Sequence, residues 1–124
     1  MLVDFQYRGD ICILHLQGRF ATGQDSLYLH TKAEELKSSG YVKVLVDFMG
    51  VDYVDSTGIG FLIGIYTSVK KSPLGQFGLA NVNRRVREVL ELTRLAQIIQ
   101  IYPNETAALE ALSGGSKSSA SQAS

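Results

Sequence analysis

Apolar residues recur along the chain with two different periods, and the changes of period divide it into strands and helices. Loose alternation over residues 2–7 and the apolar run that opens residues 11–17 predict two strands. Residues 8–10 between them carry the Gly and Asp of a turn, so the two strands should form an antiparallel hairpin. We expect residues 18–23 to form a loop.

Helical spacing follows. Apolar residues one turn apart predict a helix that begins at Asp25 or Ser26 and ends at Gly40. The β-branched run at residues 42–48 predicts a strand, and residues 51–54 should bridge to a second helix that Pro73 terminates. That helix carries an apolar stripe of Ile59, Leu62, Ile63, Tyr66 and Val69.

The last third of the chain repeats the alternation. Residues 76–80 predict a strand, Asn83 is a candidate cap for a third helix, residues 96–102 predict a strand, and a short helix follows Pro103. The order favours an α/β fold with a mixed, mainly parallel sheet of about five strands and about four helices. We expect one domain over residues 1–112, and a disordered tail over residues 113–124, which are rich in Ser and Gly.

Composition removes several classes of function. Twelve basic residues balance twelve acidic ones, so no net charge attracts nucleic acid or anionic lipid. The longest apolar stretch, residues 59–66, is far shorter than the ~20 residues of a membrane span, and no signal segment opens the chain. A single cysteine, Cys12, lies in an apolar run and fits a buried, inert thiol in a reducing cytoplasm.

The candidate chemistry lies at the start of the second helix, in the run Asp55-Ser56-Thr57-Gly58-Ile59-Gly60. An Asp cap there satisfies first-turn N–H groups, and two hydroxyls follow it directly. A phosphate on such a hydroxyl would add roughly −1.5 to −2 charge beside the positive end of the helix dipole. The run therefore suits a phosphorylation switch.

Two other interpretations of this run come from its residues alone. One is a simple capped helix, in which Gly58 and Gly60 allow close approach of a neighbouring strand or a partner. The other is a dinucleotide loop, which the context disfavours because the preceding strand is expected to end at Phe48, about nine residues earlier. Gly60 and Gly64, one turn apart, more plausibly give a flat helix face for tight packing.

Residues 54–60 closely resemble the Asp-Ser-Ser/Thr-Gly-Leu-Gly signature of the STAS domain, and more narrowly of bacterial anti-sigma factor antagonists. The preceding run Val44-Leu45-Val46-Asp47-Phe48, the N-terminal hairpin and Gly18 also match. The resemblance implies a partner-switching protein that binds an anti-sigma factor with serine kinase activity and dissociates when Ser56 is phosphorylated. A PP2C-type phosphatase would reset the cycle, and Thr57 is the less favoured acceptor. Ala21 stands where many members of the family carry an acidic residue.

The resemblance implies no catalytic residue and no cofactor in this chain. The expected partner surface consists of Phe20, Ala21, Thr22, Asp52, Tyr53, Asp55, Ser56, Thr57 and Gly58. Two alternatives stay open: a STAS scaffold or subunit of a larger signalling or transport assembly that is not phosphorylated, and a sensor of a nucleotide or other small ligand. His15 and His30 are separated by a loop and are expected to have no ligand-like companions, so a metal site is not expected.

Overall fold

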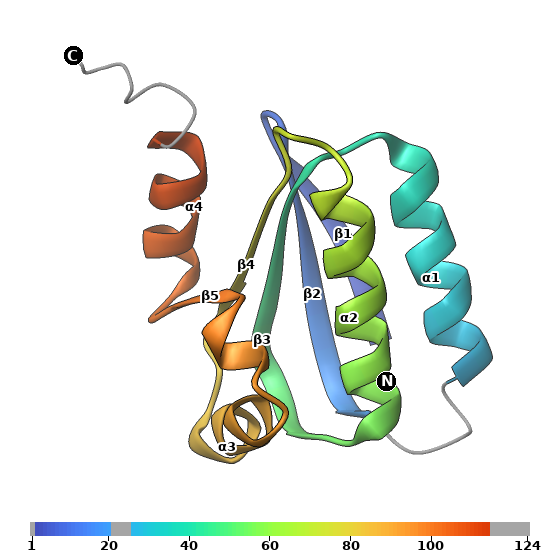
Figure 1. The fold of residues 1–124 in the computed structure, drawn as a ribbon, viewed down its shortest axis with the longest axis vertical. Coiled ribbons are helices and arrows are strands. Elements are labelled where there is room, and N and C mark those ends of the chain that lie inside the picture. The colour runs from blue at the N-terminus through green and yellow to red at the C-terminus, as the bar shows by residue number, and fades with distance from the viewer. Residues whose placement is uncertain (1, 21–25, 115–124) are drawn as a thin grey trace.

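A five-stranded sheet in the order β1-β2-β3-β4-β5 forms the centre of the protein (Figure 1). The computed structural model describes residues 2–20 and 26–114. The first two strands pair antiparallel, and the other pairs are parallel. The prediction of a mixed sheet that opens with a hairpin is confirmed. The strands are β1 Leu2–Arg8, β2 Ile11–Phe20, β3 Lys43–Val54, β4 Gln76–Ala80 and β5 Gln100–Tyr102.

Helices lie on both sides of the sheet. Helices α1 and α2 lie side by side on one face, α4 lies toward the other, and α3 lies near the end of β3 (Figure 1). The helices are α1 Ser26–Ser39, α2 Ser56–Lys70, α3 Arg84–Leu92, a 3₁₀ turn η1 Leu95–Gln97, and α4 Glu105–Gly114. No helix in the described part of the chain is long and apolar enough to cross a membrane.

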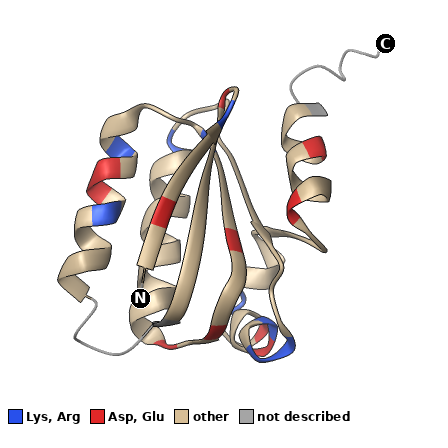
Figure 2. Ribbon diagram, turned by 180° about the vertical axis from the view of Figure 1, so that it is seen from behind, with Lys and Arg blue, Asp and Glu red and all other residues tan. Residues whose placement is uncertain are grey.

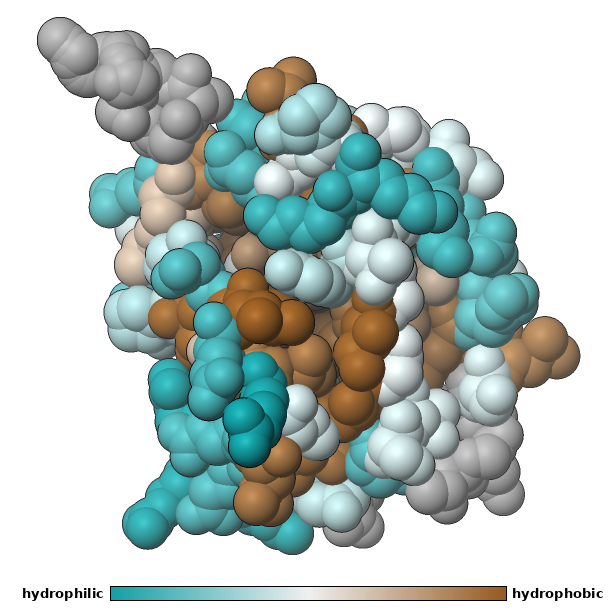
Figure 3. Space-filling model, viewed as in Figure 1, coloured by the Kyte–Doolittle hydropathy of each residue, from teal (hydrophilic) through white to brown (hydrophobic). Residues whose placement is uncertain are grey.

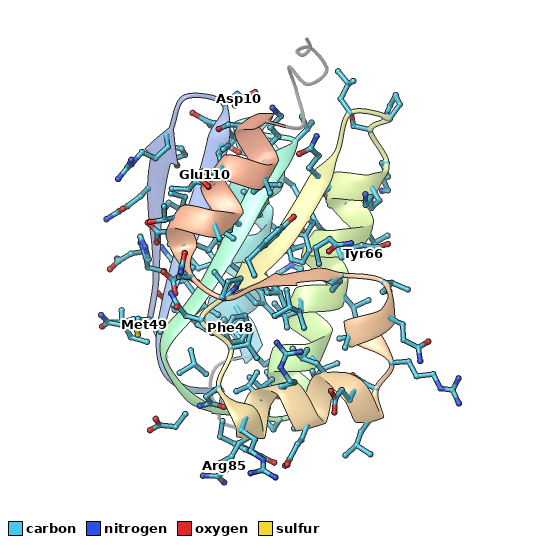
Figure 4. The ribbon with its side chains drawn as sticks, turned by 90° about the vertical axis from the view of Figure 1, so that its left-hand side faces the viewer. Asp10, Phe48, Met49, Tyr66, Arg85 and Glu110 are labelled. Atoms are coloured by element: carbon cyan, nitrogen blue, oxygen red, sulfur yellow. The ribbon has the colours of Figure 1, made fainter. Side chains whose placement is uncertain are left out.

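Alternation along β3 divides the buried residues into two clusters. Val44, Val46 and Phe48 pack in the larger core under α1 and α2, whereas Leu45 joins a smaller cluster with Ala108 and Leu112 of α4. Met49, the next residue after Phe48, points away from the core (Figure 4) and is 74% exposed. Alternate side chains of one strand thus serve opposite faces of the sheet.

Cys12 is fully buried in the larger core, as predicted. Burial disfavours the thiolate and raises the pKa of its thiol to about 11. The thiol is therefore protonated at neutral pH and has neither the charge nor the access of a reactive cysteine.

Strands β2 and β3 are longer than predicted. The expected loop after residue 17 is wrong for its first part, because β2 continues to Phe20, and residues 51–54 belong to β3 rather than to a bridge. Gly18 pairs with Val51 and Phe20 with Val54, across two irregularities in the register. Pairing between the two strands overrides the turn-like composition of residues 49–52.

The fifth strand is shorter than predicted. Residues 95–97 form the turn η1, and only residues 100–102 pair with β4. Arg94 adopts the left-handed conformation with φ of 66°, so the chain changes direction at this residue before the turn begins. Leu95 and Ile99 then face the core from opposite ends of one helical turn, so their apolar character reflects burial and not a strand.

The stripe predicted on α2 is wrong at one position. Ile63 is 44% exposed, while Phe61 and Ile65 are buried in its place. The expected tight packing over Gly60 and Gly64 is also wrong within the described residues, since a Cβ at either position would meet no atom within 4 Å. At the C-terminus, α4 includes Ser113 and Gly114, and the rest of the predicted tail lies outside the described residues.

Candidate functional site

A single residue, Asp55, separates the end of β3 from the start of α2. Its backbone is extended, and its Oδ1 accepts hydrogen bonds from the N–H groups of Thr57 at 2.9 Å and Gly58 at 3.3 Å. The predicted cap is confirmed. Because Val54 before it is fully buried in the core, the start of α2 is anchored on the strand side as well.

Ser56 is the first residue of α2 and is exposed. Thr57 is half-buried, and Gly58 is buried. Ser56 therefore directly follows the cap, as the sequence predicts, and it lies at the surface. Of the two hydroxyl residues, Ser56 is the more exposed.

Residues of α3 lie beside this helix start. Asn83 caps α3 by accepting from Val86 N–H at 2.8 Å, and its amide donates to the carbonyl oxygens of Val51 and Asp52 at 3.0 and 3.3 Å. The guanidinium of Arg85 lies 5.4 Å from the ring centre of Tyr53, within cation–π range. One cap thus ties α3 to the segment that leads into Ser56.

The structure places Asp52, Tyr53, Asp55, Ser56, Thr57 and Gly58 together, as expected for neighbours in sequence. Asp52 is exposed and Tyr53 is half-buried. Ala21 and Thr22 lie outside the described residues, and of Phe20 only the backbone, at the end of β2, is described. The sequence interpretation missed Asn83 and Arg85 as neighbours of the site. The signal for Arg85 was the basic run at residues 84–87, and the bonds of Asn83 to Val51 and Asp52 bring Arg85 next to Tyr53.

A shallow groove of about 310 Å³ runs between α1 and α2 and reaches Ser56. Its lining combines small residues of α2 with one basic side chain, Lys37. The apolar surface of α2 is visible on this side of the molecule (Figure 3). The lining residues are Ser26, Leu29, His30, Ala33, Lys37, Ser56, Thr57, Gly60, Phe61 and Gly64.

A second cluster of polar side chains lies on the opposite face of the sheet. His15 Nε2 of β2 is 2.7 Å from Glu105 Oε1 of α4 and 3.6 Å from Asp47 Oδ2 of β3. The expectation that His15 has no ligand-like companions is wrong, because they come from residues 32 and 90 positions further along the chain. His30, by contrast, is exposed on α1.

Three features define an α/β domain of the STAS class: the order of the strands in the sheet, the helix α4 on its back face, and the Asp55 cap followed by Ser56 at the start of α2. A family model for the STAS domain matches residues 3–108. The chain belongs to the STAS domain family, among its anti-sigma factor antagonists. Members of this family are generally regulators without catalytic activity.

Two relatives illustrate the similarity. The anti-sigma-B factor antagonist of Listeria monocytogenes is 33% identical over 88 residues, which cover 66% of this chain and 75% of that protein. The crystal structure of TM1081 from Thermotoga maritima has a TM-score of 0.79 at 27% identity, covering 89% of this chain and 93% of that one.

A structural neighbour is the anti-sigma factor antagonist SpoIIAA, which has been solved in two states. Its unphosphorylated form has a TM-score of 0.76 at 15% identity and covers 91% of this chain and 97% of that one. Its phosphorylated form, from Bacillus, has a TM-score of 0.65 at 17% identity and covers 86% and 96%. At these identities the comparison with SpoIIAA concerns the fold alone.

Proposed function

We propose that this protein is a phosphorylation-controlled partner switch. In this proposal it binds an anti-sigma factor that is also a serine kinase, and it is released when that kinase phosphorylates Ser56. The observation that carries the proposal is the exposed hydroxyl of Ser56 at the first position of a helix whose start is fixed by the Asp55 cap. That SpoIIAA, of the same fold, exists in phosphorylated and unphosphorylated forms supports it.

A phosphate on Ser56 would change the charge of the surface more than its shape. It would add roughly −1.5 to −2 charge next to the carboxylates of Asp52 and Asp55. The N–H groups of Thr57 and Gly58 already donate to Asp55, so the phosphate has no need to rearrange the first turn. The helix dipole offsets part of the repulsion within the protein.

The effect would then be felt at the partner interface. A like-charge contact that is desolvated between two proteins costs several kcal/mol. About 4 kcal/mol corresponds to roughly a 10³-fold change in affinity, enough to turn a bound partner into a free one. The same surface includes Arg85 on α3, which extends outward from the molecule (Figure 4), so an acidic group of the partner would have a counter-charge there.

The proposed partner surface keeps the residues expected from the family resemblance. It comprises the start of α2, Asp52 and Tyr53 before it, Phe20 at the end of β2, and Ala21 and Thr22 after that strand. A PP2C-type phosphatase would need access to the same helix start. None of these roles requires the chain itself to hold a catalytic group or a cofactor.

The test is phosphorylation by the cognate kinase with ATP, mapped by mass spectrometry. Ser56→Ala should abolish incorporation, and the matched variant Thr57→Val should retain it. Ser56→Asp should weaken binding to the anti-sigma factor while changing the free energy of unfolding by no more than about 0.5 kcal/mol, as expected for an exposed site. Phosphate elsewhere, or equal binding by Ser56→Asp and the parent, would reject the switch. Binding without any phosphorylation would favour the scaffold alternative.

A further inference from the structure

Three side chains that can bind a metal ion converge on the back face of the sheet, away from Ser56. They are His15 of β2, Asp47 of β3 and Glu105 of α4, and one donor atom from each lies within 4.8 Å of the others. Within the described part of the chain, these residues are the one group that meets this condition. We propose that they form a binding site for a divalent transition-metal cation of the zinc type.

The strand register brings two of the three donors together. His15 and Asp47 are direct partners in the parallel β2–β3 pair, on the face that also carries Leu45. Parallel partners on one face lie side by side, so backbone pairing alone fixes this half of the site. Glu105, the first residue of α4, then completes it from above the sheet.

Asp47 is oriented by groups outside the cluster. It is only 5% exposed, and its Oδ1 accepts from Met49 N–H at 2.9 Å and from the amide of Asn81 at 3.0 Å. These two bonds leave Oδ2 on the side of His15. Bonds of this kind, which hold a carboxylate in place from behind, are typical of metal ligands.

The spacing of the donors suits a small cation with little adjustment. Zn–N and Zn–O bonds of about 2.0–2.2 Å in a tetrahedron separate neighbouring donors by roughly 3.4 Å. The distances from His15 Nε2, 2.7 Å to Glu105 and 3.6 Å to Asp47, lie on either side of this value. The side chains of His15 and Glu105 are 27% and 26% exposed, so Glu105 has room to shift and water can supply a fourth ligand.

The chemistry of the donors selects the class of cation. One imidazole nitrogen with two carboxylates suits zinc and its neighbours, whereas Mg²⁺ and Ca²⁺ prefer oxygen ligands alone. Two carboxylates also match the charge of a dication. A metal ion binds Nε2 of His15 through its lone pair, so the 2.7 Å contact of Nε2 with Glu105 would be replaced by bonds from both atoms to the ion.

A metal ion bound at this site would link α4 to strands β2 and β3 of the sheet. The described contacts of α4 with β2 and β3 otherwise rest on the smaller apolar cluster, and Figure 2 shows α4 as the described helix on this face, with β1 to β3 open beside it. A cation that binds the folded protein but not the unfolded chain stabilises the fold by RT ln(1 + [ion]/Kd), so the melting temperature rises with the concentration of the free ion. The site is therefore structural and independent of the proposed switch at Ser56.

The experiment is a titration of the full, tag-free chain with Zn²⁺ by calorimetry and with Co²⁺ by visible absorption. We expect one ion per chain, tetrahedral Co²⁺ bands, and a melting temperature that rises with Zn²⁺ and falls again with chelator. His15→Gln and Glu105→Gln should each weaken binding by about tenfold or more. His30→Gln, which changes the other histidine, is the matched control and should bind as the parent does.

Circular dichroism of each variant without metal establishes that the fold is retained, and Glu105 can be changed without touching the sheet. Absence of saturable binding, equal binding by His15→Gln and the parent, or a loss confined to His30→Gln would each overturn the proposal. Mg²⁺ should produce none of these changes, and equal stabilisation by Mg²⁺ would also contradict the assignment to a nitrogen-containing site.

Discussion

Gly60 offers a sharp test of how the start of α2 is built. It is the fifth residue of that helix and is exposed, and a Cβ added there would meet no described atom within 4 Å. Glycine inside a helix is about 0.8–1.0 kcal/mol less favourable than alanine, because it loses more backbone freedom on folding. Gly60→Ala should therefore raise the free energy of unfolding by about 1 kcal/mol.

The expected shift in melting temperature follows from the size of the protein. An entropy of unfolding of about 2.1 cal/mol/K per residue converts 1 kcal/mol into about 4 °C for a chain of this length. Urea denaturation followed by circular dichroism measures the free energy directly. Gly64→Ala should shift stability in the same direction, since its surroundings are equally open within the described residues.

Gly75→Ala is the opposing control. A Cβ at Gly75 would overlap the carbonyl oxygen of Val69, which is backbone and cannot move aside cheaply, so this variant should be destabilised. If Gly60→Ala lowers the free energy of unfolding, the conclusion that a Cβ fits at this position without contact is wrong. If all three variants lower it alike, helix propensity does not decide stability at these glycines.

The same substitution also bears on the proposed interface. Gly60 lies one turn after Ser56 and lines the same groove between α1 and α2. If a partner covers this surface, Gly60→Ala should bind it more weakly while folding more stably. If the variant is stabilised and binds the partner with unchanged affinity, Gly60 lies outside the interface. That result would not contradict the expected gain in stability.

Two further predictions concern hydrogen bonds and pH. Asp55→Ala should lower the free energy of unfolding by about 1 kcal/mol and Asp55→Asn by only a few tenths, because Asn still caps the helix; equal losses in urea denaturation would show that charge, and not the cap bonds, matters. Lys43 Nζ, 2.9 Å from Asp10 Oδ2, holds the pKa of Asp10 below its usual value. This pair therefore stabilises the fold above the ordinary Asp pKa of about 3.9, and its contribution is lost as the pH falls through the lowered pKa. Asp10→Asn should make stability less dependent on pH between about 6 and 3, and an unchanged dependence would contradict this role.

Features that depend on neighbours in sequence were predictable. The hairpin, the cap by Asp55 and the exposure of Ser56 each follow from residues that lie within a few positions of one another. Hydrogen bonds in a turn or a first helical turn involve those same residues, so local composition determines them. The family motif was recognisable for the same reason.

Features that depend on tertiary pairing were not predictable. The extension of β3 through Gly50 is determined by its partner Gln17, and Ile63 is exposed because Phe61 and Ile65 face the core instead. The contact between His15 and Glu105 joins residues 90 positions apart. Only the crossover that places α4 over β2 and β3 brings these two together, and no local pattern encodes it.

Strand β3 connects the two candidate sites and also separates them. Asp47 faces the back of the sheet, whereas Asp55 caps α2 at the end of the same strand. Between them the strand is held by its pairing with β2 up to Val54, and Phe48, Val51 and Val54 are buried in the larger core. A segment fixed in this way resists small displacements, because packed interiors have few alternative arrangements. We therefore expect a phosphate at Ser56 to be sensed by a partner as charge on a rigid surface, without a change at the back of the sheet.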